Sequence, residues 1–126
     1  MTIETERLHE LVRLERLDDD GVARLVMEHD ETPMNVFRPS KVEAMATAVE
    51  SLAGEVGCLV LYGEPVFSAG ADLDSVKQTP QEMRSAKIDT IAAASNRFIR
   101  AIRSFPAPII SAVTGVAAGG GLGFAL

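Results

Sequence analysis

Residues 117–126 read AAGGGLGFAL, in which three consecutive glycines stand directly before an apolar run with the composition of a helix. Glycine has no side chain, so it lets a ligand approach the backbone closely. The first turn of a helix carries N–H groups without intrahelical partners, and the helix dipole adds partial positive charge there. The stretch therefore predicts a backbone site for an electron-rich oxygen. It matches neither the P-loop pattern nor G-x-G-x-x-G, which argues against a phosphate-binding loop.

A second loop, SAGAD at residues 68–72, has the same placement in the sequence. Each loop follows an apolar strand-like run, at 58–63 or 109–113, and precedes helical sequence. Open α/β sheets bind ligands where such strands end, so both loops are expected at one edge of a sheet. One N–H donor from each loop would form an oxyanion hole. The same residues leave an alternative open, in which the glycines only let the helix pack closely on the sheet.

Apolar periodicity predicts an α/β chain whose strands are separated by helices. Alternating residues on both sides of the turn at 18–21 predict a β-hairpin, and helices between strands favour a largely parallel sheet. The run CLVLYG, residues 58–63, is expected to be buried on both faces. The expected elements are strands at 9–16, 22–28, 58–63 and 109–113, helices at 39–52 and 80–104, a short helical turn from Asp72, and a last helix from Gly121.

The composition is that of one globular domain, with 126 residues, 47% of them hydrophobic and 24% charged. The net charge of −6 argues against general nucleic-acid binding. No apolar stretch approaches the roughly 20 residues of a membrane span, so no membrane association is expected. The single cysteine, Cys58, is expected to be buried and inert. It permits no intrachain disulfide, and the N-terminus resembles no secretory signal, so a cytoplasmic location is expected.

The two loops together carry a family resemblance. VFSAGADLDSV, residues 66–76, followed by PAPIISAVTGVAAGGGLGFAL, residues 106–126, resembles the crotonase superfamily, which is also called the enoyl-CoA hydratase/isomerase family. The resemblance implies an α/β fold, namely the N-terminal portion of the family's ββα spiral. It implies binding of acyl-CoA thioesters, stabilisation of an oxyanion or enolate at the thioester carbonyl, and assembly as a homotrimer or hexamer.

The resemblance also implies roles for individual residues. The two oxyanion donors would be the backbone N–H groups of Ala71 and Gly120, and these are the expected catalytic groups. Asp72 has an alternative role as the N-cap of a short helix. Coenzyme A is part of the substrate, and neither a separate cofactor nor a metal is expected. The residues expected to bind the coenzyme A part of the substrate are Ser68, Ala69, Gly70, Asp72, Leu73, Gly119 and Gly121.

The sequence departs from the family pattern in places that bear on the reaction. Hydratases of the family commonly carry a glutamate where this chain has Gly123, so the acid/base residues are expected beyond Leu126. Many members place a lysine or arginine near the coenzyme A phosphates where this chain has Met34. Arg38 and Lys41 are the nearby candidates for that contact.

Two hypotheses follow for the function. The first is an enzyme, a lyase or isomerase that acts on acyl-CoA. The second treats residues 1–126 as a crotonase-like core domain truncated at its C-terminal end, which would act as a non-catalytic fragment or as a module for coenzyme A binding or assembly. The acyl substrate and the reaction branch are not determined by the sequence.

Overall fold

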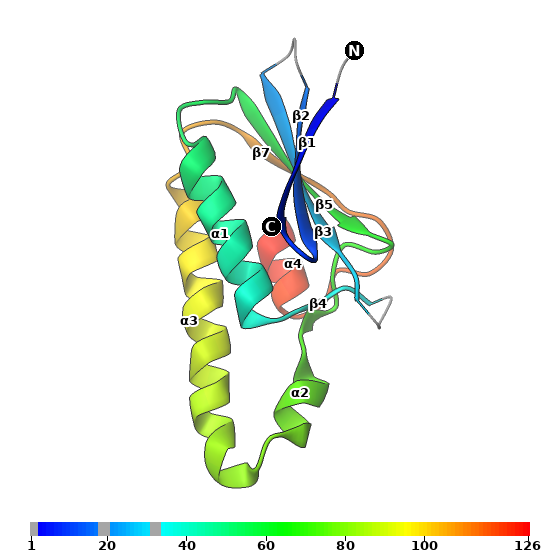
Figure 1. The fold of residues 1–126 in the computed structure, drawn as a ribbon, viewed down its shortest axis with the longest axis vertical. Coiled ribbons are helices and arrows are strands. Elements are labelled where there is room, and N and C mark those ends of the chain that lie inside the picture. The colour runs from blue at the N-terminus through cyan, green and yellow to red at the C-terminus, as the bar shows by residue number, and fades with distance from the viewer. Residues whose placement is uncertain (1–2, 18–20, 31–33) are drawn as a thin grey trace.

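The computed structural model describes residues 3–17, 21–30 and 34–126, and it has a mixed α/β architecture (Figure 1). The helix at 39–52, the strands after it and the last helix are present. The predicted hairpin is present too, but its first strand begins at Val12 rather than at residue 9, because residues 10–11 form a turn, and residues 18–20 of its predicted turn lie outside the described ranges. The elements in chain order are β1 (Ile3–His9), β2 (Val12–Leu17), β3 (Val22–Glu28), β4 (Val36–Phe37), α1 (Pro39–Leu52), β5 (Cys58–Glu64), β6 (Gly70–Ala71), α2 (Leu73–Gln78), the 3-10 helix η1 (Gln81–Met83), α3 (Arg84–Arg103), β7 (Ile109–Ala112) and α4 (Gly120–Ala125).

The main sheet has the strand order β1-β2-β3-β5-β7. β1 pairs with β2 and β2 with β3 in antiparallel fashion, whereas β3–β5 and β5–β7 are parallel. The expectation of a largely parallel sheet is therefore wrong for its N-terminal half. β1 was not expected as a separate strand, because its sequence IETERLH has no clear apolar alternation and most of its residues are exposed. A second, two-stranded sheet joins β4 and β6 in parallel.

The sheet has one buried and one partly exposed face. Along β5, Leu59 and Leu61 are buried in the core, while the residues that alternate with them, Cys58, Val60 and Tyr62, are only partly buried. The expectation that residues 58–63 are buried on both faces is therefore wrong, as is the expectation that Cys58 is fully buried. The helices cover only one face, so the alternating side chains of β5 meet two different environments.

α1 supplies most of the helical contribution to the core. It packs on β1 and β2 and against α3, and its apolar residues Val42, Met45, Ala46 and Val49, which recur at helical spacing, are buried. α3 begins at Arg84, after η1, rather than at Pro80. Figure 1 shows that the first half of α3, together with α2, extends beyond α1 and away from the sheet. Ile88 in that half is accordingly 52% exposed although its spacing is helical.

The last helix is held in place by aromatic contacts. The ring of Phe124 in α4 lies 4.8 Å from the ring of Phe37 and 4.8 Å from that of Phe98 in α3, measured between centroids. All three side chains are buried. A six-residue helix is too short to be stable alone, so this packing determines where α4 begins and points. In the part of the chain that the structure describes, none of the helices has the length and apolar character needed to cross a membrane.

Candidate active site

The two glycine-containing loops are directly hydrogen-bonded to each other. The N–H of Phe67 donates to Thr114 O at 2.8 Å, and the N–H of Ser68 donates to Val116 O at 3.0 Å. In return, the N–H of Ala118 donates to Ser68 O at 3.1 Å. The sequence predicted that the loops share a sheet edge. The structure brings them closer than that, because the backbone ladder continues past the ends of β5 and β7.

Gly70 marks the closest approach of one loop to the start of α4. A Cβ on Gly70 would lie 3.0 Å from the backbone nitrogen of Gly120 and 3.0 Å from Ala118 O. The φ angle of Gly70 is +96°, a backbone conformation that residues with a side chain rarely adopt. Gly70 and Ala71 therefore lie next to the N-terminus of α4 because position 70 carries no side chain.

Gly120 is the first residue of α4, so its N–H has no acceptor within the helix. Gly119 before it has φ +54° and turns the chain into the helix. A Cβ on Gly120 would have no heavy atom of residues 3–17, 21–30 or 34–126 within 4 Å, apart from its own neighbours in the chain and helix. Position 120 therefore has room for a side chain, and its N–H is one of the groups at the start of α4 that the helix itself does not satisfy. Its role as an oxyanion donor stays a prediction.

Gly121 has the role of the other alternative that the sequence left open, which is to let the helix pack closely. A Cβ on Gly121 would lie only 2.3 Å from Ser68 O and 2.9 Å from Ser68 C. Both are backbone atoms, which cannot rotate away as the end of a side chain can. The glycine run is thus compatible with both alternatives, close packing and a ligand site. Gly121 allows tight packing of α4 on the first loop, and Gly120 leaves space next to the start of α4.

Ala71 lies in β6, whose partner is β4. The N–H of the next residue, Asp72, donates to Phe37 O of β4 at 3.1 Å. Consecutive N–H groups of an extended strand point to opposite sides. The N–H of Ala71 therefore points away from β4. Its role as a donor to a ligand stays a prediction.

The residues expected to contact coenzyme A differ in their exposure. Ser68 is fully buried, and its hydroxyl donates to Asn35 O at 2.7 Å and accepts from the N–H of Gly70 at 3.0 Å. Leu73 is 64% exposed. Asp72 caps α2 by accepting the N–H of Ser75 at 3.2 Å, so the capping role that the sequence left open is present. Ligand contacts of these residues stay predictions.

A hollow of about 530 Å³ lies beside Asp72, between α2, the start of α1 and the first turns of α3. Arg38 in its wall forms ion pairs with Asp30 and, at 3.4 Å, with Asp72. The lining combines acidic, basic and amide side chains, and a second basic group comes from Lys87. The lining residues are Asp30, Arg38, Pro39, Asp72, Asp74, Ser75, Gln78 and Lys87.

Comparison with known proteins settles the family. Residues 18–126 match the model of the family described as "Enoyl-CoA hydratase/isomerase". The chain belongs to this family. It is 30% identical over 111 residues to a Mycobacterium avium protein named "Probable enoyl-CoA hydratase echA17", a match that covers 86% of this chain and 41% of the relative.

Solved structures of the same family share the fold. An enoyl-CoA hydratase structure from Geobacillus kaustophilus superposes with a TM-score of 0.79 at 18% identity, over 98% of this chain and 45% of that one. One from Shewanella pealeana superposes with a TM-score of 0.70 at 28% identity, over 93% and 43%. The crotonase-like fold expected from the two loops is therefore confirmed. The chain spans about two-fifths of the length of the relatives it matches.

Lys41, one of two candidates for a phosphate contact, does not reach the surface of this family member. Its side chain is fully buried, and its ammonium group donates to Glu28 O at 2.7 Å, Asn35 Oδ1 at 2.5 Å and Val36 O at 3.3 Å. The expectation that Lys41 contacts a bound phosphate is therefore wrong, because all three of its N–H donors meet protein oxygens. Arg38, whose side chain is 43% exposed, keeps that option.

Burial dominates the ionisation of Lys41. It lowers the pKa of the ammonium from 10.5 to about 8, since a charge is disfavoured away from water. Arg38 lowers the pKa further, whereas Asp30 and Glu28 raise it. The sequence offered no signal for this buried lysine, because a charged residue in the first turn of a helix is usually solvated.

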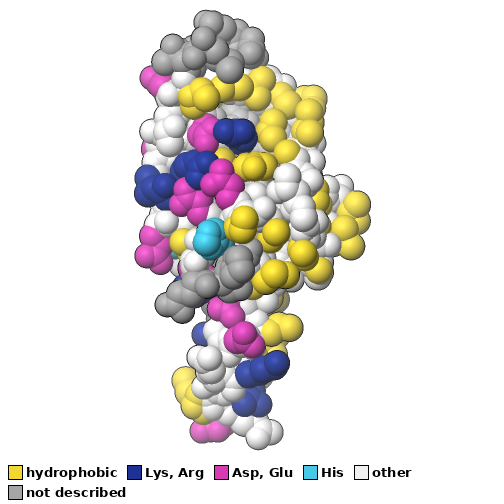
Figure 2. Space-filling view, turned by 90° about the vertical axis from the view of Figure 1, so that its right-hand side faces the viewer, with side chains coloured by type: hydrophobic (Ala, Val, Ile, Leu, Met, Phe, Trp, Pro, Cys, Tyr) yellow, Lys and Arg dark blue, Asp and Glu magenta, His cyan; other side chains and the backbone are white. Residues whose placement is uncertain are grey.

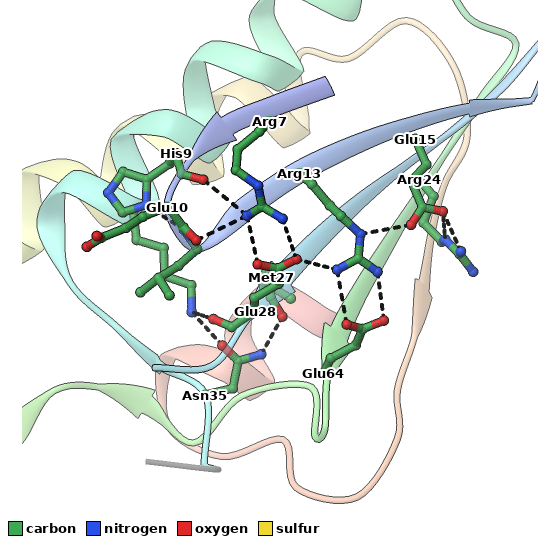
Figure 3. A network of polar contacts seen from close by, with 12 residues as sticks. Arg7, His9, Glu10, Arg13, Glu15, Arg24, Met27, Glu28, Asn35 and Glu64 are labelled. Atoms are coloured by element: carbon green, nitrogen blue, oxygen red, sulfur yellow. Dashed lines mark hydrogen bonds and ion pairs between the residues drawn. The ribbon is translucent and has the colours of Figure 1, made fainter. Parts of the chain in front are cut away.

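The sheet face that the helices leave open carries a ladder of paired charges (Figure 3). Arg13 is at its centre, with a two-pronged contact to Glu64 at 2.8 and 3.1 Å and an ion pair to Glu28. Figure 2 shows these mixed acidic and basic side chains beside a patch of hydrophobic ones. The ladder is electrically balanced, with three basic and three acidic members, so it stabilises the sheet rather than attracting a charged ligand. Its members are Arg7, Arg13, Glu15, Arg24, Glu28 and Glu64.

Hydrogen bonds from Arg7 and Arg13 lower the pKa of Glu28 from 4.5 to about 2, against a desolvation effect that raises it. The hydrogen bond with Glu64 is the largest of the effects that raise the pKa of Arg13 above its ordinary value. Among the described residues, no group of three histidine, cysteine, aspartate or glutamate side chains is placed to hold a metal ion.

Proposed function

We propose that this protein binds acyl-CoA thioesters and stabilises negative charge on the thioester oxygen with the backbone N–H groups of Ala71 and Gly120. The observation that carries the proposal is the meeting of two loops. The N–H of Gly120 begins α4 and has no acceptor within the helix, and the loop that carries the N–H of Ala71 is hydrogen-bonded to the segment before α4. Membership of the enoyl-CoA hydratase/isomerase family supports this assignment.

The chemistry follows from where charge develops. Withdrawal of the α-proton of an acyl-CoA, or addition to the β-carbon of an enoyl-CoA, moves electrons onto the thioester oxygen. Two N–H groups that are already oriented stabilise this oxygen more in the transition state than in the ground state. Each such donor lowers the barrier by about 3–4 kcal/mol. The dipole of α4 adds to the donor at Gly120, although a helix of six residues adds little.

The two loops themselves supply no free carboxylate for proton transfer. Position 123 is glycine, and the carboxylate of Asp72 is engaged with Ser75 and Arg38 in the described part of the chain. The proposal therefore assigns the general acid and base to residues outside the two loops. Hydration, isomerisation, hydrolysis and dehalogenation all remain compatible with the oxyanion site.

The coenzyme A portion of the ligand is proposed to lie along the first loop and α2. Leu73 offers apolar surface for the pantetheine arm, and the hollow beside Asp72 has Arg38 and Lys87 in its wall. These two basic side chains can place positive charge at the oxygens of a phosphate, which would compete with Asp30 and Asp72 for Arg38.

A second candidate is a binding or assembly module without its own turnover. It is supported by the loops themselves, in which position 123 is glycine and the carboxylate of Asp72 is engaged with Ser75 and Arg38. Titration calorimetry with coenzyme A and with crotonyl-CoA separates the two candidates. Binding without turnover favours the module, whereas binding with turnover favours the enzyme. The trimeric or hexameric assembly that the resemblance implies is a further proposal, which light scattering tests.

The oxyanion role is tested at Ala71. Substitution of Ala71 by proline removes the N–H, whereas substitution by glycine keeps it. We expect Ala71→Pro to lower kcat/KM for an enoyl-CoA by about 100-fold to 1000-fold, and Ala71→Gly to lower it by less than about 10-fold. Circular dichroism and the affinity for free coenzyme A control for the fold. Unchanged turnover in a folded Ala71→Pro variant would show that this N–H is not a donor.

A further inference from the structure

Lys41 is an unusual residue for its place in the fold. It lies in the first turns of α1, where its neighbours Val42 and Met45 are core residues, and it is itself fully buried. Burying an ammonium group is costly unless its hydrogen bonds are satisfied. Here all three N–H groups have acceptors, which raises the question of what this costly arrangement holds in place.

Lys41 determines the orientation of the Asn35 side chain. An ammonium group can only donate hydrogen bonds, so the atom of Asn35 that faces it must be the amide oxygen. The amide nitrogen is thereby directed to Met27 O at 2.9 Å, Val66 O at 3.0 Å and Phe67 O at 2.9 Å. Figure 3 shows Asn35 beside the end of β3 with the bond to Met27.

Asn35 also has a strained backbone. Its φ angle is +54°, a value that few residues other than glycine adopt, and asparagine is among those that tolerate it best. Its side chain is fully buried. A backbone strain of this kind persists only where the surrounding contacts impose it, and such sites cluster at functional loops. The contacts that impose it here come from Lys41 and from the segment before the first glycine loop.

The network continues from Asn35 into the first glycine loop. The hydroxyl of Ser68 donates to Asn35 O at 2.7 Å and accepts the N–H of Gly70 at 3.0 Å. Gly70 immediately precedes Ala71, the proposed donor. A continuous set of buried hydrogen bonds thus runs from the ammonium of Lys41 through Asn35 and Ser68 to the backbone of the loop.

We infer that Lys41 and Asn35 are positioning residues for the oxyanion loop, and that the buried ammonium orients the Ala71 N–H through Asn35 and Ser68. The inference rests on the proposed function of Ala71. Neither side chain touches the ligand in this account. Removing the ammonium leaves the buried Asn35 Oδ1 without a donor, and this weakens the hold of Asn35 on residues 66–68 and hence on the orientation of the donor. A displacement of about 1 Å in such a group costs about 100-fold in rate.

The inference is tested by vibrational spectroscopy of bound crotonyl-CoA that is isotope-labelled at the thioester carbonyl. Hydrogen bonds from two N–H groups lower the carbonyl stretching frequency, so the shift on binding reports the oxyanion site directly. The variants are Lys41→Met, which keeps the unbranched apolar stem but removes the charged end, and Ser68→Ala, which removes the link to Gly70. The matched control is Val49→Ala, a fully buried residue of α1 outside the network.

We expect Lys41→Met and Ser68→Ala to lose most of the carbonyl shift, while the dissociation constant of Lys41→Met for crotonyl-CoA stays within about threefold. Where turnover is measured, kcat is expected to fall by about 10-fold to 100-fold with little change in KM. The double variant is expected to lose little more than either single one, because both act on one network. Val49→Ala is expected to lose stability and keep the full shift.

The outcomes separate this inference from the proposed function. A carbonyl shift that is present in the unaltered protein and retained in both network variants overturns the inference and leaves the oxyanion site in place. The absence of a shift in the unaltered protein overturns the oxyanion proposal and this inference with it. If Lys41→Met does not fold, Ser68→Ala decides alone. A loss of shift in Val49→Ala equal to that in Lys41→Met would show that general loosening, and not the network, is responsible.

Discussion

Substitution of Gly121 by alanine tests the packing of the two loops with a close control on the same helix. A Cβ at position 121 would lie 2.3 Å from Ser68 O, so the backbone of α4 and that of the first loop must separate by about 1 Å to restore an ordinary contact. A Cβ at position 123 would have nothing within 4 Å among the described residues outside α4 and its own chain neighbours. Gly121→Ala and Gly123→Ala thus add the same group to one helix, against backbone in the first case and into open space in the second.

The two variants differ in sign. In a helix, replacing glycine by alanine stabilises by about 0.5–1 kcal/mol. Overpacking against unyielding neighbours destabilises by about 1–3 kcal/mol. We therefore expect Gly123→Ala to be neutral or stabilised by up to about 1 kcal/mol, and Gly121→Ala to be net destabilised by about 1–2 kcal/mol. The outward shift of α4 also moves Gly120 relative to Ala71, so kcat for an enoyl-CoA is expected to fall by about 100-fold in Gly121→Ala.

Urea denaturation followed by circular dichroism measures the first quantity, and steady-state turnover measures the second. The m-values of the two variants serve as a check, since an unchanged m-value means that the compactness of the folded and unfolded states is preserved. The reasoning is refuted if Gly121→Ala is as stable as Gly123→Ala. It is refuted in its functional part if Gly121→Ala is destabilised but turns over substrate at the normal rate, because the loop contact would then be unrelated to the proposed donors.

Three further predictions follow from the charged groups. The pKa of Lys41 is about 8 in the folded protein and 10.5 in the unfolded one, so the unfolded state binds more protons between these pH values. The free energy of unfolding should therefore rise by up to about 3 kcal/mol from pH 8 to 10.5. Lys41→Met should abolish this rise, and its absence in the unaltered protein would contradict the effect of burial on the pKa. Because Arg7 lowers the pKa of Glu28 to about 2, the ionised Glu28 contributes stability that is present above pH 4.5 and lost as the pH falls towards 2. Between these pH values, the free energy of unfolding of Glu28→Gln should fall by up to about 2 kcal/mol less than that of the unaltered protein. Identical acid denaturation profiles would refute the pairing. Asp72→Ala should speed hydrogen exchange of the Ser75 amide by about fivefold, because it removes the capping oxygen. Asp72→Asn keeps that oxygen and should leave the exchange rate unchanged. Equal rates in the two variants would show that the cap is unimportant.

Much of the fold could be predicted from apolar periodicity. The hairpin of β2 and β3, the helix at 39–52 with its buried face, and the strand β7 all have patterns that local physics explains. β1 escaped prediction because an exposed edge strand needs no apolar alternation and is stabilised mainly by pairing with β2. The exposure of Ile88 could not be foreseen, because helical spacing predicts a buried stripe only where another element lies against it.

The candidate site was predictable in a similar, partial way. Glycines beside a helix start indicated backbone donors, and the positions of the two loops in the chain indicated one sheet edge. The close packing at Gly121 and the open space at Gly120 were not predictable, because they depend on which of two adjacent Cα atoms faces Ser68 O. The burial of Lys41 was missed for a related reason, since its three acceptors come from β3 and from residues 35–36, which meet only in the folded chain.

The sequence by itself determined the family and the order of most elements, and it predicted the place of two backbone donors, because these follow from local features: apolar period, helix starts and glycine. Only the tertiary structure decided which glycine packs and which stays open, that Lys41 serves the interior rather than a phosphate, and that a buried polar network ends one residue before Ala71. The physical reason is that hydrogen-bond acceptors and steric neighbours at these positions lie far away in the chain. The energy of a buried ammonium or of a missing Cβ is set by those neighbours and not by the residues beside it in the sequence.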